Sequence, residues 1–230
     1  MKKFLFAAAV AVLTASVYAA TPVARYDFEY ISSLDIKGKG KVEAVPGVKG
    51  KAVKITNATI TIPAPEKITP ACGTILLWIK PVNWDDSKPE FVFFLQNFNK
   101  SKKGRIILYK YAGNRNLGTT FFYGDPDNTK ARTVLGYPKA DMSAGKWFCL
   151  AATWDKKAGE TALYFNGKKV HSKKFTAFYE NFGDFILNPP AFRPSNPHYS
   201  TCYDMLQFYD KALSAAEIAN IYAAEKPEKK

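Results

Sequence analysis

The sequence has few of the residues that build metal centres and nucleophilic active sites. It contains three cysteines and two histidines among 230 residues, and no C-x-x-C or H-x-x-x-H spacing occurs. A structural zinc site needs such closely spaced ligands, so zinc is not expected. His171 and His198 also lack the surroundings of a catalytic triad, so the cysteines have no partner that would make one of them a nucleophile.

Long hydrophobic runs are scarce too, and the clearest one lies at the start. Lys2 and Lys3 precede a mostly apolar run over residues 4–17, and the small-x-small sequence Val17-Tyr18-Ala19 follows. This order is typical of a secretory signal peptide that is cleaved after Ala19. A permanent membrane anchor needs about 20 apolar residues, and this run is shorter. We therefore predict a signal peptide over residues 1–19, a secreted, periplasmic or extracellular location, and no membrane span.

Acidic residues are outnumbered, 20 against 33 basic ones. Removal of the signal peptide takes away Lys2 and Lys3 and leaves an excess of +11. Such a charge favours anionic partners such as acidic glycans or membrane surfaces, and export argues against nucleic acid. Many lysines fall at predicted turns and strand edges, where they discourage edge-to-edge pairing, so solubility is an alternative explanation.

The three cysteines, Cys72, Cys149 and Cys202, allow one disulfide and one remaining thiol in an exported chain. Their spacing does not say which pair would form.

Short alternating or apolar runs recur along the chain, separated by Gly, Pro, Asn and Asp. Helical periodicity is absent before residue 214, so the sequence predicts an all-β domain. Eleven strands are more than one open sheet holds comfortably, which indicates two packed sheets, and Asn166-Gly167 predicts a tight hairpin between two of them. The predicted strands are residues 24–30, 52–55, 59–62, 74–80, 91–96, 105–111, 119–123, 147–154, 161–165, 169–175 and 203–209.

The last predicted strand runs into a short helix that would close the domain. Leu206 and Phe208 alternate with other residues and are expected to face the core, and Asp204 shares their face. Ser214 and Glu217 have the spacing of a capping box, which predicts the start of a helix. An apolar stripe after this box would pack on the sandwich.

Six blocks of sequence occur in the order ARYDFEY, GVKGKAVKI, TILLWIKP, KWFCLAATWD, ALYFNGKKV and YDMLQFYDKALSAAEIANIY. Together they resemble the LamG-like (laminin G, pentraxin-like) domains of the concanavalin A-like lectin and glucanase superfamily. The resemblance implies a two-sheet antiparallel jelly-roll sandwich with a short C-terminal helix over residues 20–225. It also implies binding of carbohydrate or protein. The charged residues 226–230 are predicted to be a disordered tail.

Some relatives in that superfamily hold a structural Ca²⁺ between a loop and an acidic residue of the last strand. The matching positions here are Asp35, within residues 34–40, and Asp204. Lys37 and Lys39 in this loop supply no oxygen and repel the ion, whereas Ca²⁺ takes six to eight oxygen ligands. The alternative for Asp204 is a buried carboxylate that accepts hydrogen bonds. We expect no cofactor other than this Ca²⁺.

Enzymes of the superfamily carry carboxylates on one strand in an E-x-D-x-x-E or E-x-D-x-E pattern, and this pattern is absent. Asp27 and Glu29 are the nearest imitation, and they lie where relatives have no catalytic function. We therefore predict no catalytic residue. The preferred hypothesis is a secreted, non-catalytic carbohydrate-binding domain, for which an acidic glycan would suit the charge. The alternative is a protein-interaction or surface-assembly domain, and a glycoside hydrolase is a distant third.

Sugar binding uses aromatic rings for stacking and polar side chains for hydroxyl groups. Trp84 lies in the polar loop WDDSKPE, although a loop tryptophan often packs on its own domain. The Pro-rich segment 188–202 is predicted to be a rim loop of the site, with a plain crossover as the alternative. The candidate binding residues are Trp84, Tyr109, Tyr111, Asn114, Arg115, Tyr123, Arg193 and Tyr199. The family positions expected to be structural are Trp78, Trp147 and Phe165.

Overall fold

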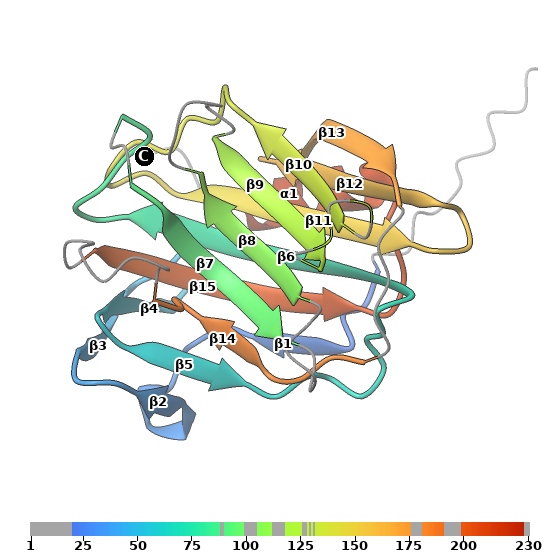
Figure 1. The fold of residues 1–230 in the computed structure, drawn as a ribbon. Coiled ribbons are helices and arrows are strands. Elements are labelled where there is room, and N and C mark those ends of the chain that lie inside the picture. Colours follow the sequence, from blue (N-terminus) through green and yellow to red (C-terminus); the bar gives the residue numbers. More distant parts are fainter. Residues whose placement is uncertain are drawn as a thin grey trace, which may run out of the picture.

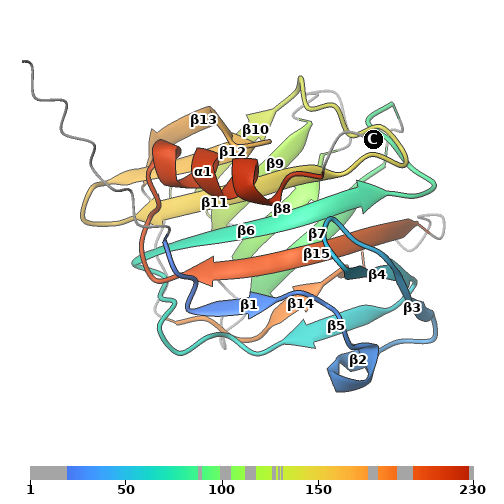
Figure 2. The same ribbon diagram turned by 180° about the vertical axis from the view of Figure 1, so that it is seen from behind.

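The computed structural model describes residues 20–87, 90–98, 105–111, 118–125, 128, 130, 132–175, 181–190 and 199–227. Two antiparallel β-sheets stack face to face, and one helix lies on the outer side of one sheet (Figures 1 and 2). Within these ranges, no helix combines the length and the apolar character that a membrane crossing requires. The predicted all-β jelly-roll sandwich with a C-terminal helix is confirmed.

Sheet A has eight strands in the described part of the chain. Its strands, in spatial order, are β13 (Lys168–Lys174), β12 (Glu160–Phe165), β11 (Phe148–Asp155), β6 (Cys72–Pro81), β15 (Ser200–Tyr209), β4 (Lys51–Thr56) and β3 (Lys41–Pro46), and β1 (Ala24–Tyr26) also pairs with β15. The first strand therefore pairs with the last one, which brings the two ends of the domain together.

Sheet B has seven strands in the same described ranges. In spatial order they are β10 (Arg132–Tyr137), β9 (Thr119–Gly124), β8 (Arg105–Lys110), β7 (Val92–Phe98), β14 (Phe185–Leu187), β5 (Thr59–Ile62) and β2 (Asp35–Lys37). A short 3-10 helix, η1 (Ile31–Ser33), precedes β2. The chain passes repeatedly between the two sheets, as in a jelly roll.

The core lies between the sheets, and most strands contribute alternate side chains to it. Its large aromatic residues also satisfy their polar atoms. Trp154 donates from Nε1 to the Thr69 carbonyl at 2.9 Å, and the Tyr123 hydroxyl donates to the Pro70 carbonyl at 2.6 Å. A buried ring with a hydrogen-bonded polar atom contributes its apolar area without the cost of an unsatisfied donor.

Helix α1 (Ala215–Glu225) forms a third layer on the outer face of sheet A (Figure 2). The predicted capping box is present, because Ser214 accepts from the Glu217 backbone N–H and Glu217 accepts from the Ser214 backbone N–H. Ile218, on the side of the helix that faces the sheet, is fully buried, and Tyr222 stacks on Trp78 at 5.5 Å between ring centroids. The C-terminal segment thus shields the apolar outer side of one sheet.

The strand prediction holds for all eleven predicted segments, although several of their bounds shift by a few residues. The first strand ends at Tyr26 instead of residue 30, because Phe28 has φ of 54° and leaves the extended region. The predicted hairpin at Asn166-Gly167 is confirmed by positive φ angles of 49° and 77°. Four strands were missed: β2, β3, β10 and β14.

The predicted direction of Asp204 is wrong. The register of β15 against β6 shifts between Asp204 and Gln207, and Met205 has φ of 47°. This extra residue is a β-bulge, which re-aims the side chains before it. Asp204 therefore lies opposite Trp78 on the outer face of sheet A, while Leu206 faces the core as predicted.

The structure contains no disulfide among its three cysteines, all of which lie within the described ranges. Cys149 pairs opposite Trp78 and Cys202 opposite Lys80, so β6 separates them. Two strand spacings are about 9.6 Å, whereas a disulfide needs Cα atoms within about 7 Å. Cys72 lies at the other end of β6, so the single disulfide that the sequence allowed does not form.

Candidate functional site

The outer face of sheet B carries a continuous group of aromatic side chains. In β8, Ile106 and Leu108 face the core, so Ile107 and Tyr109 face outward. The same alternation in the neighbouring strands turns further rings to this side. In the described part of the chain no helix lies over this face (Figure 1). The rings that we name the aromatic cluster are Phe91, Phe93, Tyr109, Tyr111 and Phe122.

The rings of the aromatic cluster contact one another in favourable geometries. Phe91 lies 5.1 Å from Tyr111 between centroids at an interplanar angle of 73°, and 6.2 Å from Tyr109. Phe93 meets Tyr109 edge to face at 5.5 Å. These distances fall in the range in which aromatic pairs attract. Phe93, Tyr109 and Phe122 are buried, but Phe91 and Tyr111 are half-buried, so the accessible end of the cluster is at these two rings.

Positive charge lies at the opposite end of the cluster. The guanidinium carbon of Arg105 is 5.4 Å from the ring centroid of Phe122, which is a cation–π contact. Burial raises the pKa of Tyr109 to about 12, while Arg105 and Arg132 oppose the rise. Tyr109 is therefore a neutral phenol at physiological pH.

The Tyr111 end of the cluster opens on a pocket of about 310 Å³ where β8 ends and β9 begins. Gly118 in its wall has φ of 57°, and a Cβ there would lie 2.1 Å from the Tyr137 carbonyl oxygen, so only glycine fits. In the adjoining loop, Asp85 accepts hydrogen bonds from the backbone and the hydroxyl of Ser87 at 2.9 and 2.5 Å. The pocket is lined by Asp86, Ser87, Lys110, Tyr111, Gly118, Pro138 and Met142.

Lys110 is a buried lysine in the wall of this pocket. Only 2% of it is exposed, and its Nζ donates to the Glu90 carbonyl oxygen at 2.9 Å. Burial lowers the pKa of this ammonium group, and the nearby Glu90, Asp85 and Asp86 oppose that change. The pocket thus combines a fixed cationic donor, a carboxylate, a hydroxyl and an aromatic ring, a set that suits a ligand with several hydroxyl groups.

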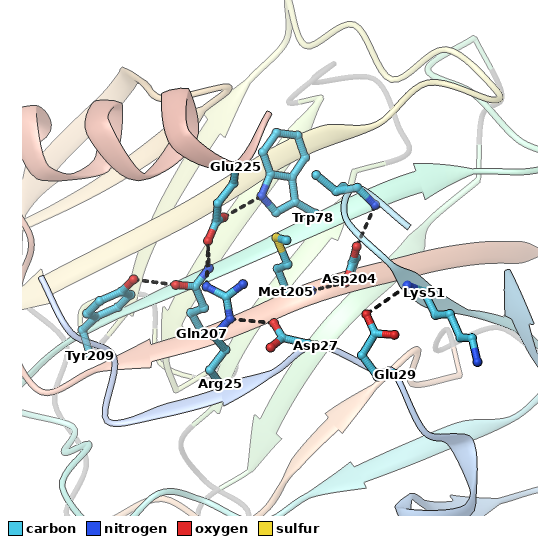
Figure 3. A network of polar contacts seen from close by, with 11 residues as sticks. Arg25, Asp27, Glu29, Lys51, Trp78, Asp204, Met205, Gln207, Tyr209 and Glu225 are labelled. Carbon is cyan, nitrogen blue, oxygen red and sulfur yellow. Dashed lines mark hydrogen bonds and ion pairs between the residues drawn. The ribbon is translucent and has the colours of Figure 1, made fainter. Parts of the chain in front are cut away.

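A second polar group lies beneath α1 on the outer face of sheet A (Figure 3). The Glu225 carboxylate accepts from Trp78 Nε1 at 3.0 Å, from Gln207 Nε2 at 2.8 Å and from Arg25 Nη1 at 3.0 Å. The Tyr209 hydroxyl donates to Gln207 Oε1 at 2.6 Å. We call these five residues the Glu225 network. All of them except Trp78 line a pocket of about 430 Å³, but because the five residues bond to one another we interpret them as the attachment of α1.

The two residues predicted to bind calcium lie on different sheets. Asp35, in β2 of sheet B, is 3.2 Å from the Lys37 ammonium. Asp204, in β15 of sheet A, accepts from the backbone N–H groups of Val48 at 2.7 Å and Met205 at 2.8 Å (Figure 3). Burial raises the pKa of Asp204 to about 7. The described residues contain no group of three or more His, Cys, Asp or Glu that could hold a metal.

The carboxylates of Asp27 and Glu29 also have structural partners (Figure 3). Asp27 accepts from Arg25 Nε at 2.6 Å, and Glu29 accepts from the Lys51 backbone N–H at 3.0 Å. They therefore connect the segment after β1 to neighbouring parts of sheet A.

Two predicted binding residues belong to the core, so their assignment to a site is wrong. Trp84 is 1% exposed, donates from Nε1 to Thr201 Oγ1 at 2.9 Å and stacks on Phe94 at 5.7 Å. The polar loop folds its single tryptophan inward, since that ring is its main apolar group. Tyr123 is fully buried because its position in β9 faces sheet A.

The other candidates divide into three groups. Tyr109 and Tyr111 come together in the aromatic cluster. Tyr199 is half-buried just before β15, where burial and the neighbouring Glu90 carboxylate raise its pKa. The candidates that lie outside the described residues are Asn114, Arg115 and Arg193.

The sequence reasoning missed Phe91, Phe93, Arg105 and Phe122. The signal was present in the F-x-F and Y-x-Y spacing of two strands that are neighbours in the sheet. Such spacing places both rings of a strand on one face, and the inner face was already filled by the residues between them.

A sequence model described as the concanavalin A-like lectin/glucanases superfamily matches residues 54–219, more than half of the chain. The chain belongs to this superfamily. No relative was found among curated protein sequences.

Solved structures that share the fold of this superfamily member include several binding domains. Domain 4 of AbnA, a GH43 extracellular arabinanase from Geobacillus stearothermophilus in complex with arabinotriose, is 18% identical with a TM-score of 0.67, and the match covers 89% of this chain and all of that domain. The binding domain of Paraclostridial Mosquitocidal Protein 1 is 17% identical with a TM-score of 0.66, covering 86% of this chain and 50% of that one.

The ligand-binding domain of botulinum neurotoxin serotype D, in complex with N-acetylneuraminic acid, is 15% identical with a TM-score of 0.63, and the match covers 83% of this chain and 46% of that one. The superfamily member thus spans the whole arabinanase domain but about half of each toxin domain. At these identities the likeness shows the fold alone.

Proposed function

We propose that this superfamily member is a secreted, non-catalytic carbohydrate-binding domain that holds a sugar at the Tyr111 end of the aromatic cluster. The observation that carries the proposal is the position of Tyr111, which belongs to the ring array and also lines the polar pocket. A sugar has apolar C–H faces and polar hydroxyl edges, and this junction offers a partner for each.

In the proposed complex, Tyr111 and Phe91 contact the C–H face of one sugar ring. Asp86, Ser87 and the Lys110 ammonium take its hydroxyl groups. Because the Lys110 ammonium is already bonded to the Glu90 carbonyl and the Ser87 hydroxyl to Asp85, little side-chain entropy is lost on binding. The arabinotriose complex of the arabinanase domain and the N-acetylneuraminic acid complex of the toxin domain support carbohydrate as the ligand class for this sandwich.

Export is part of the proposal and rests on the N-terminal sequence. The basic start, the apolar run over residues 4–17 and the small residues before Ala20 support cleavage of a signal peptide. Mass spectrometry of the protein after expression with its leader in a bacterial host gives the test, and a mature mass that begins at Ala20 is expected.

A glycan array tests the proposed site, with residues 20–230 of the wild type and of three variants in the presence and absence of Ca²⁺. We expect selective binding to a glycan class, at least a tenfold loss for Tyr111→Ala and a smaller loss for Tyr111→Phe. The matched control is Tyr30→Ala, since Tyr30 is 74% exposed and lies outside the cluster. Equal binding by Tyr111→Ala and the control contradicts the site, and a blank array contradicts the glycan and favours a protein partner.

A further inference from the structure

Besides the Glu225 network, the outer face of sheet A carries a row of side chains that α1 does not cover. Trp78, on this face, is stacked under Tyr222 of the helix. Lys80 lies two residues further along β6 and so shares its face. It pairs in register with Cys202 of β15, which in turn pairs with Lys54 of β4.

We name this row the basic row: Trp147, Lys80, Cys202 and Lys54. Trp147 immediately precedes β11, in which Phe148 pairs with Ile79, so the indole lies beside Lys80.

Lys80 is held in place by an aromatic ring instead of a carboxylate. Its Nζ lies 4.8 Å from the centroid of the half-buried Trp147 ring. Within the described residues, no Asp or Glu oxygen lies within 4.0 Å of this ammonium. A cation–π contact orients a cation but does not neutralise it, so the charge remains available to an anion.

Lys54, at the other end of the basic row, shares a single carboxylate with a second lysine. Its Nζ is 3.1 Å from Glu43 Oε2, while Lys41 is 2.6 Å from Glu43 Oε1. Two ammonium groups therefore share one carboxylate, and Glu43 helps to fix the position of Lys54. Asp204, the other carboxylate near the row on this face, accepts hydrogen bonds from the Val48 and Met205 backbone N–H groups. With Lys80 counted, three ammonium groups stand against two carboxyl groups.

A single small residue, Cys202 of β15, lies in register between the two lysines, and it is 2% exposed. The two Cα atoms are separated by two strand spacings, or roughly 10 Å. Burial raises the pKa of the Cys202 thiol and both ammonium groups oppose that rise, which agrees with the register positions of Lys80 and Lys54 on either side of Cys202. A tetrahedral or planar oxyanion above Cys202 would be within reach of both flexible stems.

We propose that the basic row binds a sulfate group of an acidic glycan, as a second site on the opposite face from the aromatic cluster. The inference rests on the proposed glycan-binding function and adds the anionic substituent that the ligand carries. Two neighbouring charges on the face of a sheet match one substituent of a glycan chain. A lipid surface needs a broad basic patch with apolar side chains that enter the membrane. The exposed large apolar residues among those described, Tyr30, Ile36 and Val82, do not form such a group.

The test is an array on which each glycan is printed in sulfated and unsulfated form. The key variant is the double substitution Lys54→Met with Lys80→Met, which keeps the aliphatic stems. The matched control is Lys168→Met with Lys173→Met, which removes the same charge from exposed positions of the edge strand β13. A third variant, Lys54→Arg with Lys80→Arg, keeps the charge.

The wild type, the control and the arginine variant should prefer the sulfated form. The Lys54/Lys80 methionine variant should lose about tenfold in affinity for it, as expected for two solvent-facing ion pairs, and should bind the unsulfated form normally. Equal binding of both forms by the wild type overturns the inference. Equal losses in the two methionine variants also overturn it, because the effect would then be one of net charge.

The same array separates this inference from the proposed function. If Tyr111→Ala abolishes binding and the Lys54/Lys80 methionine variant does not differ from its control, the aromatic site stands and the basic row falls. If the methionine variant loses the sulfate preference and Tyr111→Ala changes nothing, the basic row stands and the aromatic site falls. Binding of the wild type to anionic phospholipid vesicles with no glycan bound would overturn the assignment to a glycan.

Discussion

Replacement of Glu225 by alanine should lower the free energy of unfolding by about 3 kcal/mol. The Glu225 carboxylate is 8% exposed and receives hydrogen bonds from Trp78, Gln207 and Arg25. Its loss leaves the Trp78 and Gln207 donors buried without their acceptor, at about 1–3 kcal/mol for each group. Arg25 contributes less, because it is 37% exposed and keeps its bond to Asp27.

Two effects reduce this cost. The pocket of about 430 Å³ beside the Glu225 network has room for water, which can accept hydrogen bonds from some of the donors that lose the Glu225 carboxylate. In addition, Glu225 is the last residue of α1, where the helix dipole disfavours a carboxylate by about 0.3–1 kcal/mol. The two donors together would cost about 2–6 kcal/mol, and these two effects bring the expected loss in the free energy of unfolding to about 3 kcal/mol. Glu225→Gln retains one acceptor oxygen and should cost about half as much.

Urea denaturation of the wild type and the variants, followed by tryptophan fluorescence, measures these differences. The matched control is Lys226→Ala, the next residue along the chain, whose side chain is exposed. A Glu225→Ala loss under about 1 kcal/mol would show that the helix is held by its apolar contacts alone. A control that costs as much as Glu225→Ala would show a general effect on the end of the helix. Either result refutes the assigned role of the network.

Three further predictions concern Asp204, Trp84 and the cysteines. Folding raises the pKa of Asp204 to about 7, above the usual value of about 3.9. The folded state therefore holds more protons between these values, so stability should fall as the pH rises from 4 to 8, and this component should vanish in Asp204→Asn in urea titrations at several pH values.

Trp84→Phe should lower stability by about 2 kcal/mol and leave glycan binding unchanged on the array, because it removes the bond to Thr201 inside the core. Dithiothreitol should leave Tm unchanged, and alkylation of the denatured protein without reductant should label three cysteines by mass, since none is paired. A fall in Tm with reductant would contradict the free thiols.

Much of the fold follows from the alternation of apolar residues, since strands with a buried face need such a pattern. The strands that the sequence did not reveal are short or lie at the edges of the sheets. β2, β3 and β10 are edge strands, and β14 has three residues. An edge strand pairs on one side only and tolerates residues such as Glu43 and Pro46 of β3, which weaken the alternating pattern.

The site was harder to predict because burial does not distinguish the two faces of a sandwich sheet. Every residue of β9 is buried, yet Tyr123 contributes to the core and Phe122 to the aromatic cluster. Alternation along the strand shows that the two residues lie on opposite faces, but it does not show which of the two faces the core. Asp204 shows a second reason, because the bulge at Met205 has no signal in the residue types and reverses the face of the residues before it.

The two outer faces of this sandwich differ in their chemistry for a structural reason. On sheet A, α1 covers the apolar side chains around Trp78, and the basic row with Lys80 lies outside the part of the face that the helix covers. On sheet B, no helix among the described residues covers the outer face, and the accessible end of the aromatic cluster consists of the rings of Phe91 and Tyr111. Stacking and charge are therefore placed on opposite sides of one rigid core. A ligand that used both would have to pass around an edge of the sandwich, so we expect substitutions on the two faces to act independently.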